Sequence, residues 1–535
     1  MSRFGDLAVV KELTPRTLAL FFFMSIGAIN FGFDNNWWNC ALSLQEFADY
    51  YGPPSKDGGP KTLPSSWQSA GSGTANAGMV IGCLIAGAIG RRVGRRMSIV
   101  VLVGIALVGM IIQNAIHSFW AVMAGRMINA ISMGIESNVM PMYMAELAPP
   151  AIRGSIVNFY QWWQMIGALL AVGIVFGSRH YGNEWSFRIV MLVQLIIPIL
   201  LFCIVWILPE SPRWLLMKDR REDAYKSLAF IRKGAATPME VEQELDLLQE
   251  ANFEQEHFHR ATSYKDCIQG SNGRRTLIAA SVQVLQQLQG NSFISSYGVI
   301  YLQQLGVTDA LKAQVIFVSM SLAGASFAFY LADRVGRRPL FLSTAVLAWA
   351  CIWFSAGLSS FWPGGVSGGP VAKGSLSCML IWSCLTTLGW GSCVWITTSE
   401  VATAQLREKT ISIATIFSFI AVLLVTYINP FVQNAPGNLG SKVGFVYGSF
   451  SVIAFVWVYF MVPELSGRSL EELDELFQSK VSARMFKSYQ CSGVGAKITA
   501  IQDLNANAHA HILEGKGGGD SEVVSQENVN MDAKV

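Results

Sequence analysis

Long stretches without any charged side chain limit the possible folds of this chain more than any other feature. Four of them are also strongly apolar, and each holds about 20 residues, enough for a helix to cross a bilayer: 97–115, 189–208, 340–359 and 443–462. Only 14% of the residues are charged and 52% are hydrophobic, whereas about 25% are charged in an average soluble domain. The sequence therefore predicts an integral membrane protein.

Eight weaker apolar runs carry isolated polar residues. They cover residues 17–38, 70–90, 118–144, 154–178, 276–303, 310–332, 374–399 and 410–432. Together with the four uncharged runs they predict twelve transmembrane helices, so we expect an all-α membrane protein.

The chain contains an internal repeat. Three features recur at the same offset of 254 residues: Glu146 and Glu400, Arg153 and Arg407, and the Pro-Glu pairs that begin at Pro209 and Pro463. Equal offsets in separate motifs indicate two homologous halves of six helices, an arrangement typical of secondary transporters whose substrate site lies between the halves.

The repeat and the apolar runs together predict the domain organisation. We expect an N-terminus at 1–16, a first half at 17–208, a helical segment at 209–275, a second half at 276–463 and a tail at 464–535. In the helical segment, Val241, Leu245 and Leu248 fall on one side of an amphipathic helix. The tail is polar, and we expect it to be largely disordered after about residue 478.

Basic residues gather in three short loops. They are Arg91, Arg92, Arg95 and Arg96 in the first loop, Arg334, Arg337 and Arg338 in the second, and Arg407 and Lys409 in the third. Because cytosolic loops carry the excess of Lys and Arg, both termini, the helical segment and the tail are expected in the cytosol.

Asp34 is the only acidic residue in the first apolar run. A carboxylate at the centre of a membrane helix costs about 3 kcal/mol on insertion scales. Arg126 is a charge of opposite sign in the run 118–144, and pairing removes most of the cost of burying two opposite charges separately. We therefore expect a buried Asp34–Arg126 ion pair, either static and important for packing or active in proton coupling.

A polar stripe runs through the seventh predicted helix. It holds Gln286, Gln287, Asn291 and Ser292. Such a stripe must face protein or water in a helix that is immersed in lipid. Gln161 in the fifth helix is a further isolated amide, which either bonds to a neighbouring helix or faces a ligand.

Over residues 15–478 the chain resembles the sugar-porter family of the major facilitator superfamily. The resemblance is carried by motifs that occur in the family's order: FGFD, GRM, PESPRWL, QQLQGN, LADRVGRR and PELSGRSLEELDELF. The region around LREKT is closest to fungal hexose and α-glucoside carriers. The chain departs from the family at Arg91, where an Asp is usual, at Ser392 in place of a proline, and at Ser292 in place of a sugar-contacting Asn.

The resemblance implies roles for these residues. Gln161, Gln286, Gln287, Asn291, Ser292 and Trp395 match positions of the sugar site. Trp395 would stack on the sugar, unless it is a buried structural residue. Proton-coupled relatives have Asp at the position of Asp34. The resemblance also indicates that charges at the cytosolic ends of the helices close the outward-facing state: Arg92, Glu146, Arg153, Arg334, Glu400 and Arg407.

We therefore expect a secondary transporter of a mono- or disaccharide, working by alternating access as a proton symporter. A change in the Asp34–Arg126 distance would link proton binding to substrate movement. Two alternatives stay open: a carrier or exporter of another polyol or a secondary metabolite, favoured by the departures at Ser292 and Ser392, and a nutrient sensor, disfavoured by the short tail.

An enzyme is not expected. The sequence shows no nucleophile–base constellation, no phosphate-binding loop and no His or Cys cluster with metal spacing. We expect no catalytic residue, cofactor or metal, and no nucleic-acid partner. The expected partners are a sugar, a proton and the lipid bilayer, with the chain as a monomer in the plasma membrane.

Overall fold

The computed structural model describes residues 15–54, 61–147, 153–233, 237–261, 263–361, 369–403, 405–466, 470–479, 481–486 and 489. Throughout this part of the chain the regular elements are helices. The tail predicted to be disordered lies largely outside the described residues, as does most of the predicted N-terminal segment.

The first half of the molecule is a bundle of six long helical segments. They are α2 (Pro15–Leu42), α4 (Ser65–Val93), α5 (Arg95–Ala115), α6 (Phe119–Leu147), α7 (Arg153–Ser178), and a sixth segment broken into α8 (Trp185–Val193) and α9 (Ile196–Ile204). The short helix α3 (Gln45–Tyr51) follows α2, and the 3-10 turn η2 (Arg179–Tyr181) follows α7.

The second half repeats this plan. Its segments are α13 (Gly270–Gln286) with η4 (Gln287–Asn291) and α14 (Ser292–Gln304), α15 (Ala310–Val335), α16 (Arg337–Phe361), α17 (Pro370–Thr386) with η5 (Thr387–Gly391) and α18 (Ser392–Val401), α19 (Arg407–Gln433) and α20 (Val443–Met461). The turns η3 (Tyr264–Cys267) and η6 (Gly440–Lys442) lie before α13 and α20, and α21 (Leu470–Gln478) follows α20.

Nine helical segments in the described part of the chain are long and apolar enough to cross a membrane. The other three long segments, α2, α6 and α13–η4–α14, carry the polar residues that form the sites below. The prediction of a twelve-helix membrane protein in two six-helix halves is confirmed by this architecture.

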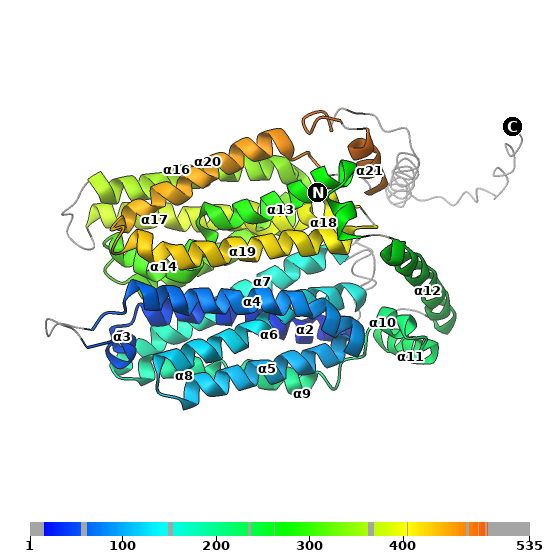
Figure 1. Ribbon diagram of the computed structural model, residues 1–535, viewed down its shortest axis with the longest axis horizontal. Helices are drawn as coiled ribbons and strands as arrows, with labels where there is room; N and C mark the ends of the chain where they lie inside the picture. Colours follow the sequence, from blue (N-terminus) through cyan, green and yellow to red (C-terminus); the bar gives the residue numbers. More distant parts are fainter. Residues whose placement is uncertain are drawn as a thin grey trace, which may run out of the picture.

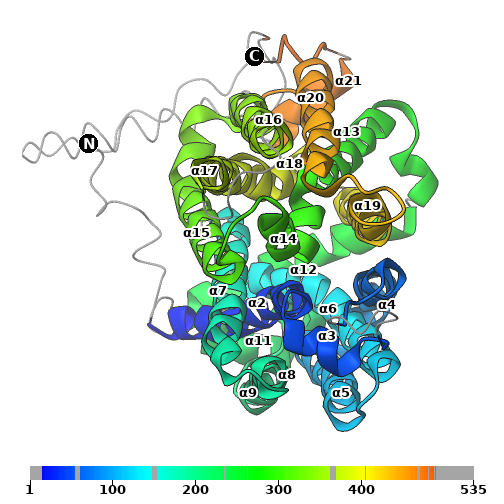
Figure 2. The same cartoon turned by 90° about the vertical axis from the view of Figure 1, so that its left-hand side faces the viewer.

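The two halves lie side by side with their helices roughly parallel (Figure 1). Seen end-on, α2, α4 and α7 of the first half face α14, α15 and α19 of the second (Figure 2). The helices α10 (Pro212–Met217), α11 (Arg221–Ile231) and α12 (Pro238–Ala261) lie at the end of the bundle opposite α3 (Figure 1). We call these two ends the α3 end and the α12 end.

The segment between the halves contains the amphipathic helix that the sequence predicts. Val241 and Leu245 of α12 are buried against a small apolar core formed with α10 and α11, and Leu248 packs at its edge. The amphipathic pattern is therefore confirmed, and the exposed residues of α12 include Glu242 and Asp246.

Two glycines allow α2 and α7 to pack with their backbones in contact. A Cβ atom at Gly32 would lie 1.9 Å from the carbonyl oxygen of Gln164, and one at Gly167 would lie 2.1 Å from that of Ile29. Since no other residue fits these positions, the glycines fix the depth of α7 beside α2, and with it the position of Gln161.

Candidate functional site

A first cavity lies between the two halves, and we call it the amide cavity. It is lined by Gln161, Met165, Gln286, Gln289, Asn291, Trp382, Thr386, Thr387, Trp390 and Gly391. It holds about 450 Å³ of empty space, its open mouth included. No residue of this wall carries a charge, so the cavity suits a polar but uncharged ligand.

Breaks in two helices shape this cavity. The segments η4 and η5 are single π-helical turns, a feature that is frequent at functional sites. In η4, Gly290 has a φ of 109°, which is readily adopted only by glycine. The side chain of Gln286 donates a hydrogen bond of 2.8 Å to the carbonyl of Trp390 in η5, so the two breaks are tied together at the cavity wall.

The structure brings together some of the predicted sugar-site residues. Gln161, Gln286 and Asn291 line the amide cavity. Gln287 and Ser292 are not among the lining residues. Gln287 donates to Ser418 at 3.3 Å and accepts from Ser292 at 2.7 Å.

Trp395 does not line the amide cavity. The tryptophans in the wall are Trp382 and Trp390. The extra residue in the π-helical turn η5 changes which side chains of this segment face inward, a change that helical periodicity alone does not predict.

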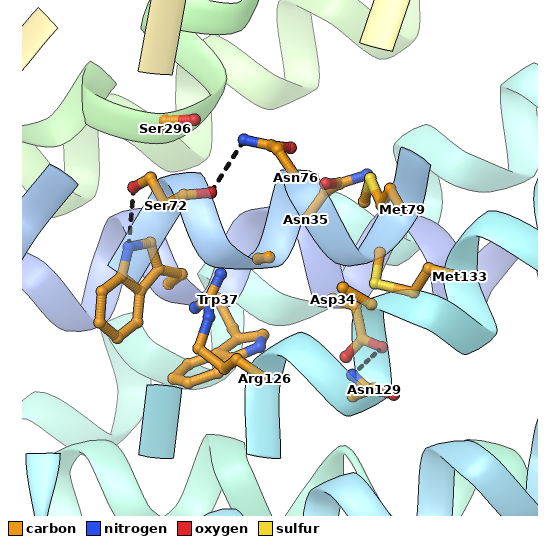
Figure 3. A pocket seen from close by; sticks show the side chains of 13 residues that line it. Asp34, Asn35, Trp37, Ser72, Asn76, Met79, Arg126, Asn129, Met133 and Ser296 are labelled. Atoms are coloured by element: carbon orange, nitrogen blue, oxygen red, sulfur yellow. Dashed lines mark hydrogen bonds between the residues drawn. The ribbon is translucent and has the colours of Figure 1, made fainter. Parts of the chain in front are cut away.

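A second cavity lies within the first half, and we call it the acid cavity. It is formed mainly by α2, α4 and α6, and it contains Asp34, Arg126 and Asn129 (Figure 3). Asp34 is 3% exposed. Its carboxylate accepts one hydrogen bond from Asn129, at 2.9 Å, and another from Gln194 at the break between α8 and α9.

The expected Asp34–Arg126 ion pair is wrong as a direct contact. The two side chains line the same cavity, but no carboxylate of the described residues lies within 4.0 Å of the Arg126 guanidinium. The guanidinium lies instead over the rings of Trp37 and Trp38, at 5.0 and 4.0 Å from their centroids. Arg126 and Trp37 are labelled in Figure 3. Asn129, one helical turn after Arg126, takes the place beside the carboxylate.

Stacking on tryptophan gives the buried guanidinium partial compensation through the cation–π interaction. Its Nε and one terminal nitrogen have no hydrogen-bond partner among the described residues. The acid cavity therefore holds two opposite charges at close range without a direct bond, an arrangement that a small movement of α2 against α6 can change.

Comparisons with known proteins decide the family. The family model described as sugar (and other) transporter matches residues 20–477. The chain belongs to this family of transporters.

The relatives of the transporter include named fungal proteins. It is 28% identical to the low-affinity glucose transporter HXT3 of Saccharomyces cerevisiae, over 86% of this chain and 81% of that protein. It is 30% identical to the probable glucose transporter rco-3 of Neurospora crassa, over 85% and 78%. It is 29% identical to the major facilitator-type transporter ecdD of Aspergillus rugulosus, over 88% and 89%.

Among solved structures, the transporter resembles the proton:xylose symporter XylE of Escherichia coli bound to 6-bromo-6-deoxy-D-glucose. The TM-score is 0.70 at 21% identity, over 86% of this chain and 99% of XylE. This likeness shows the major facilitator fold, and the family consists of carriers rather than enzymes.

Several buried polar residues of the transporter were missed by sequence reasoning. Asn129 and Gln194 hold the Asp34 carboxylate, and a second acid, Glu136, is completely buried in α6 and bonded by Asn30. Gln194 is a lone amide within the uncharged run 189–208, and this was the signal that could have revealed it.

The predicted gating charges lie at the α12 end of the transporter, where two of them pair with arginines outside the predicted set. Glu146 forms an ion pair of 2.8 Å with Arg95, and Glu400 one of 3.0 Å with Arg337. Arg92 and Arg334 are exposed. Arg407 begins α19 and Arg153 begins α7, but the side chain of Arg153 lies outside the described residues.

Hydrogen bonds join the two halves of the transporter toward the α3 end. Asn39 accepts from the backbone N–H of Val299 at 3.1 Å. Arg179 holds Asp309 through two bonds, at 2.5 and 2.9 Å. The Arg179 guanidinium lowers the pKa of Asp309, so this carboxylate is ionised at neutral pH.

Proposed function

We propose that this transporter moves a mono- or disaccharide by alternating access. The observation that carries the proposal is the amide cavity, to which the first half contributes Gln161 and the second half Gln286 and Asn291. Each sugar hydroxyl both donates and accepts a hydrogen bond, and a side-chain amide offers both without burying a charge. The relatives named as glucose transporters support a sugar as the cargo.

We propose that the two halves rock about this cavity. The bonds of Asn39 and Arg179 hold the α3 end together, so opening toward that side requires them to break. In the opposite state, the charges at the α12 end would hold that end together: Arg92, Glu146, Arg153, Arg334, Glu400 and Arg407. The excess of basic residues at this end supports a cytosolic location for it and for both termini, with the transporter a monomer in the plasma membrane.

We propose that Asp34 binds the coupling proton and that Arg126 tunes it. Asp34 is buried in α2, the helix that also packs closely against α7 and therefore lies beside Gln161. Protonation would remove the negative charge that faces Arg126 across the acid cavity. A movement of α2 against α6 would thereby link proton binding to the state of the carrier.

A transport assay tests the cargo. The purified protein, reconstituted in vesicles, is given labelled hexoses, pentoses and α-glucosides under a pH gradient, with and without an uncoupler. We expect accumulation of at least one sugar that collapses when the uncoupler is added. If no sugar is taken up or competes, the sugar assignment fails. The cargo would then be another polyol or a secondary metabolite. The relative ecdD, whose name specifies no sugar, is consistent with that alternative.

A single substitution tests the coupling. With Asp34→Asn, pH-driven accumulation should be lost, whereas exchange of labelled for unlabelled sugar in the same vesicles reports whether the protein is folded. Asp49→Asn, the same change on the exposed face of α3, is the matched control. Unchanged accumulation with Asp34→Asn would show that the proton binds elsewhere.

A further inference from the structure

Glu136 is a buried acid that the proposed function does not use. It lies in the middle of α6, ten residues after Arg126 and seven after Asn129, and it has no solvent-exposed surface. Seven residues of helix correspond to a rise of about 10 Å, so Glu136 lies nearer the α12 end than Asn129 does. An ionisable side chain at such a depth in a membrane helix is expensive and is usually functional.

One amide faces this acid. Asn30 of α2, 1% exposed, donates a hydrogen bond of 3.0 Å from Nδ2 to the Oε2 atom of Glu136. A Cβ atom at Gly27 would lie 3.0 Å from the other carboxyl oxygen, Oε1. Oε1 therefore packs against the backbone of α2, away from water.

Two oxygens at this site lack a donor. Oε1 of Glu136 and Oδ1 of Asn30 have no hydrogen-bond partner in the part of the chain that the structure describes. Both are acceptors if Glu136 is ionised, and a buried acceptor without a donor is costly. If Oε1 carries a proton, the carboxyl group gains an O–H donor. Oδ1 of Asn30 is a free acceptor on the amide that already donates to Oε2.

The described residues around Glu136 offer no positive charge to stabilise its ionised form. The ionisable groups that interact with it electrostatically are Asp34 of α2, which is also acidic, and Tyr160 of α7. From α4 the titratable side chain at this level is Cys83, which contacts Gly134 and Ser137. The charged residues of α4 and α5 lie only where these two helices meet, at Arg91–Arg96.

We propose that Glu136 is a second proton-binding site, held as the neutral acid by Asn30. The two sites are built alike: Asp34 on α2 faces the amide of Asn129 on α6, and Glu136 on α6 faces the amide of Asn30 on α2. Asn30 and Asp34 are four residues apart and so lie on the same face of α2. The two acid–amide pairs follow the α2–α6 contact from the acid cavity toward the α12 end, as a proton path would.

The protonation of Glu136 is tested without transport. Infrared spectra of the purified full-length protein at neutral pH show the carbonyl band of a protonated carboxylic acid, which shifts in heavy water. We expect a component of this band that is lost in Glu136→Gln, kept in Asp34→Asn and shifted in Asn30→Leu. If the band is absent from the wild type, or if Glu136→Gln leaves it unchanged, Glu136 is ionised and the proposal is overturned.

The role of Glu136 in transport rests on the proposed sugar–proton coupling and is tested separately. In Glu136→Gln vesicles, pH-driven accumulation relative to sugar exchange should fall about tenfold, while Ser137→Ala, on the neighbouring residue, leaves this ratio unchanged. An unchanged ratio in Glu136→Gln overturns the role in the proton path. Failure of the coupling proposal itself is distinguishable, because it would appear as full accumulation in Asp34→Asn, with the infrared result on Glu136 unaffected.

Discussion

In the first half of the transporter, α2 and α6 bury two acids and an arginine, whereas the second half lines the amide cavity with neutral residues. At the repeat offset of 254 residues, Arg126 and Glu136 correspond to Leu380 and Trp390. Asp34, Arg126 and Glu136 have exposures of 3%, 9% and 0%. Under the proposed function the duplicated scaffold divides its tasks, with the proton-coupling charges in one half and most contacts to the sugar in the other.

One glycine–glutamate contact is the same in both halves of the repeat. Gly94 and Gly336, with φ of 92° and 94°, each leave room for a glutamate that follows the last helix of the same half, Glu210 and Glu464. Glu210 accepts from the N–H of Arg95 at 2.8 Å, and Glu464 accepts from the N–H of a second arginine at 3.1 Å. The repeat is thus preserved where helices must be held together and lost where the two cavities differ.

The largest expected effect comes from making the first half resemble the second. Arg126→Leu removes the cation of the acid cavity and should lower the free energy of unfolding by roughly 3 kcal/mol, because Asp34 is left buried without a countercharge. Adding Asp34→Asn should restore a large part of this loss. A double-mutant cycle on thermal unfolding in detergent measures the coupling, and strictly additive losses would show that the two charges do not interact.

The next effect concerns the amide cavity. Gln286→Met should raise the KM for sugar about fivefold, through the loss of a hydrogen bond worth about 1 kcal/mol, and leave the pH dependence of uptake unchanged. Gln283→Met, one turn earlier on α13 and outside the cavity wall, is the matched control. A KM that rises equally in both variants would mean that the change acts through packing of α13.

Glu210 and Glu464 predict effects that are equal to each other and smaller than that of Arg126→Leu. Glu210→Gln and Glu464→Gln each weaken charge-assisted bonds to two successive backbone N–H groups, and each should cost about 1–2 kcal/mol. Thermal unfolding of the purified variants, with the exposed Glu250→Gln in α12 as control, measures this. Clearly unequal losses of unfolding free energy would show that the two glutamate sites are equivalent in geometry but not in energy.

The smallest effect is expected at the α3 end. Because the pKa of Asp309 is lowered by Arg179, the ion pair contributes stability above the ordinary pKa of an aspartate, about 4, and loses it only as the pH falls through the lowered pKa. Asp309→Asn should therefore reduce the free energy of unfolding by at most about 1 kcal/mol, equally from pH 5 to pH 8. Asparagine keeps the N-cap of α15, and a difference that vanishes within this pH range would contradict the assignment.

Much of the fold could be predicted from local features of the sequence. Apolar runs of membrane length, the offset of 254 residues and the amphipathic pattern of Val241 and Leu245 each depend only on residues close together in the chain or on exact repetition. The candidate ligand residues Gln161, Gln286 and Asn291 could be chosen because amides in apolar helices are conspicuous. Trp395 was chosen by motif, and the π-helical turn η5 placed Trp390 in the wall instead.

The sequence by itself determined that this chain forms twelve membrane helices in two halves, because the bilayer leaves few other ways to satisfy the backbone of such runs. It also determined that Asp34 and Arg126 need compensation. Only the tertiary structure decided how they receive it: amides for the acid, and indole rings for the guanidinium. Which of several possible partners meets a buried charge depends on the rotation and depth of neighbouring helices, and these are set by packing between residues far apart in the chain.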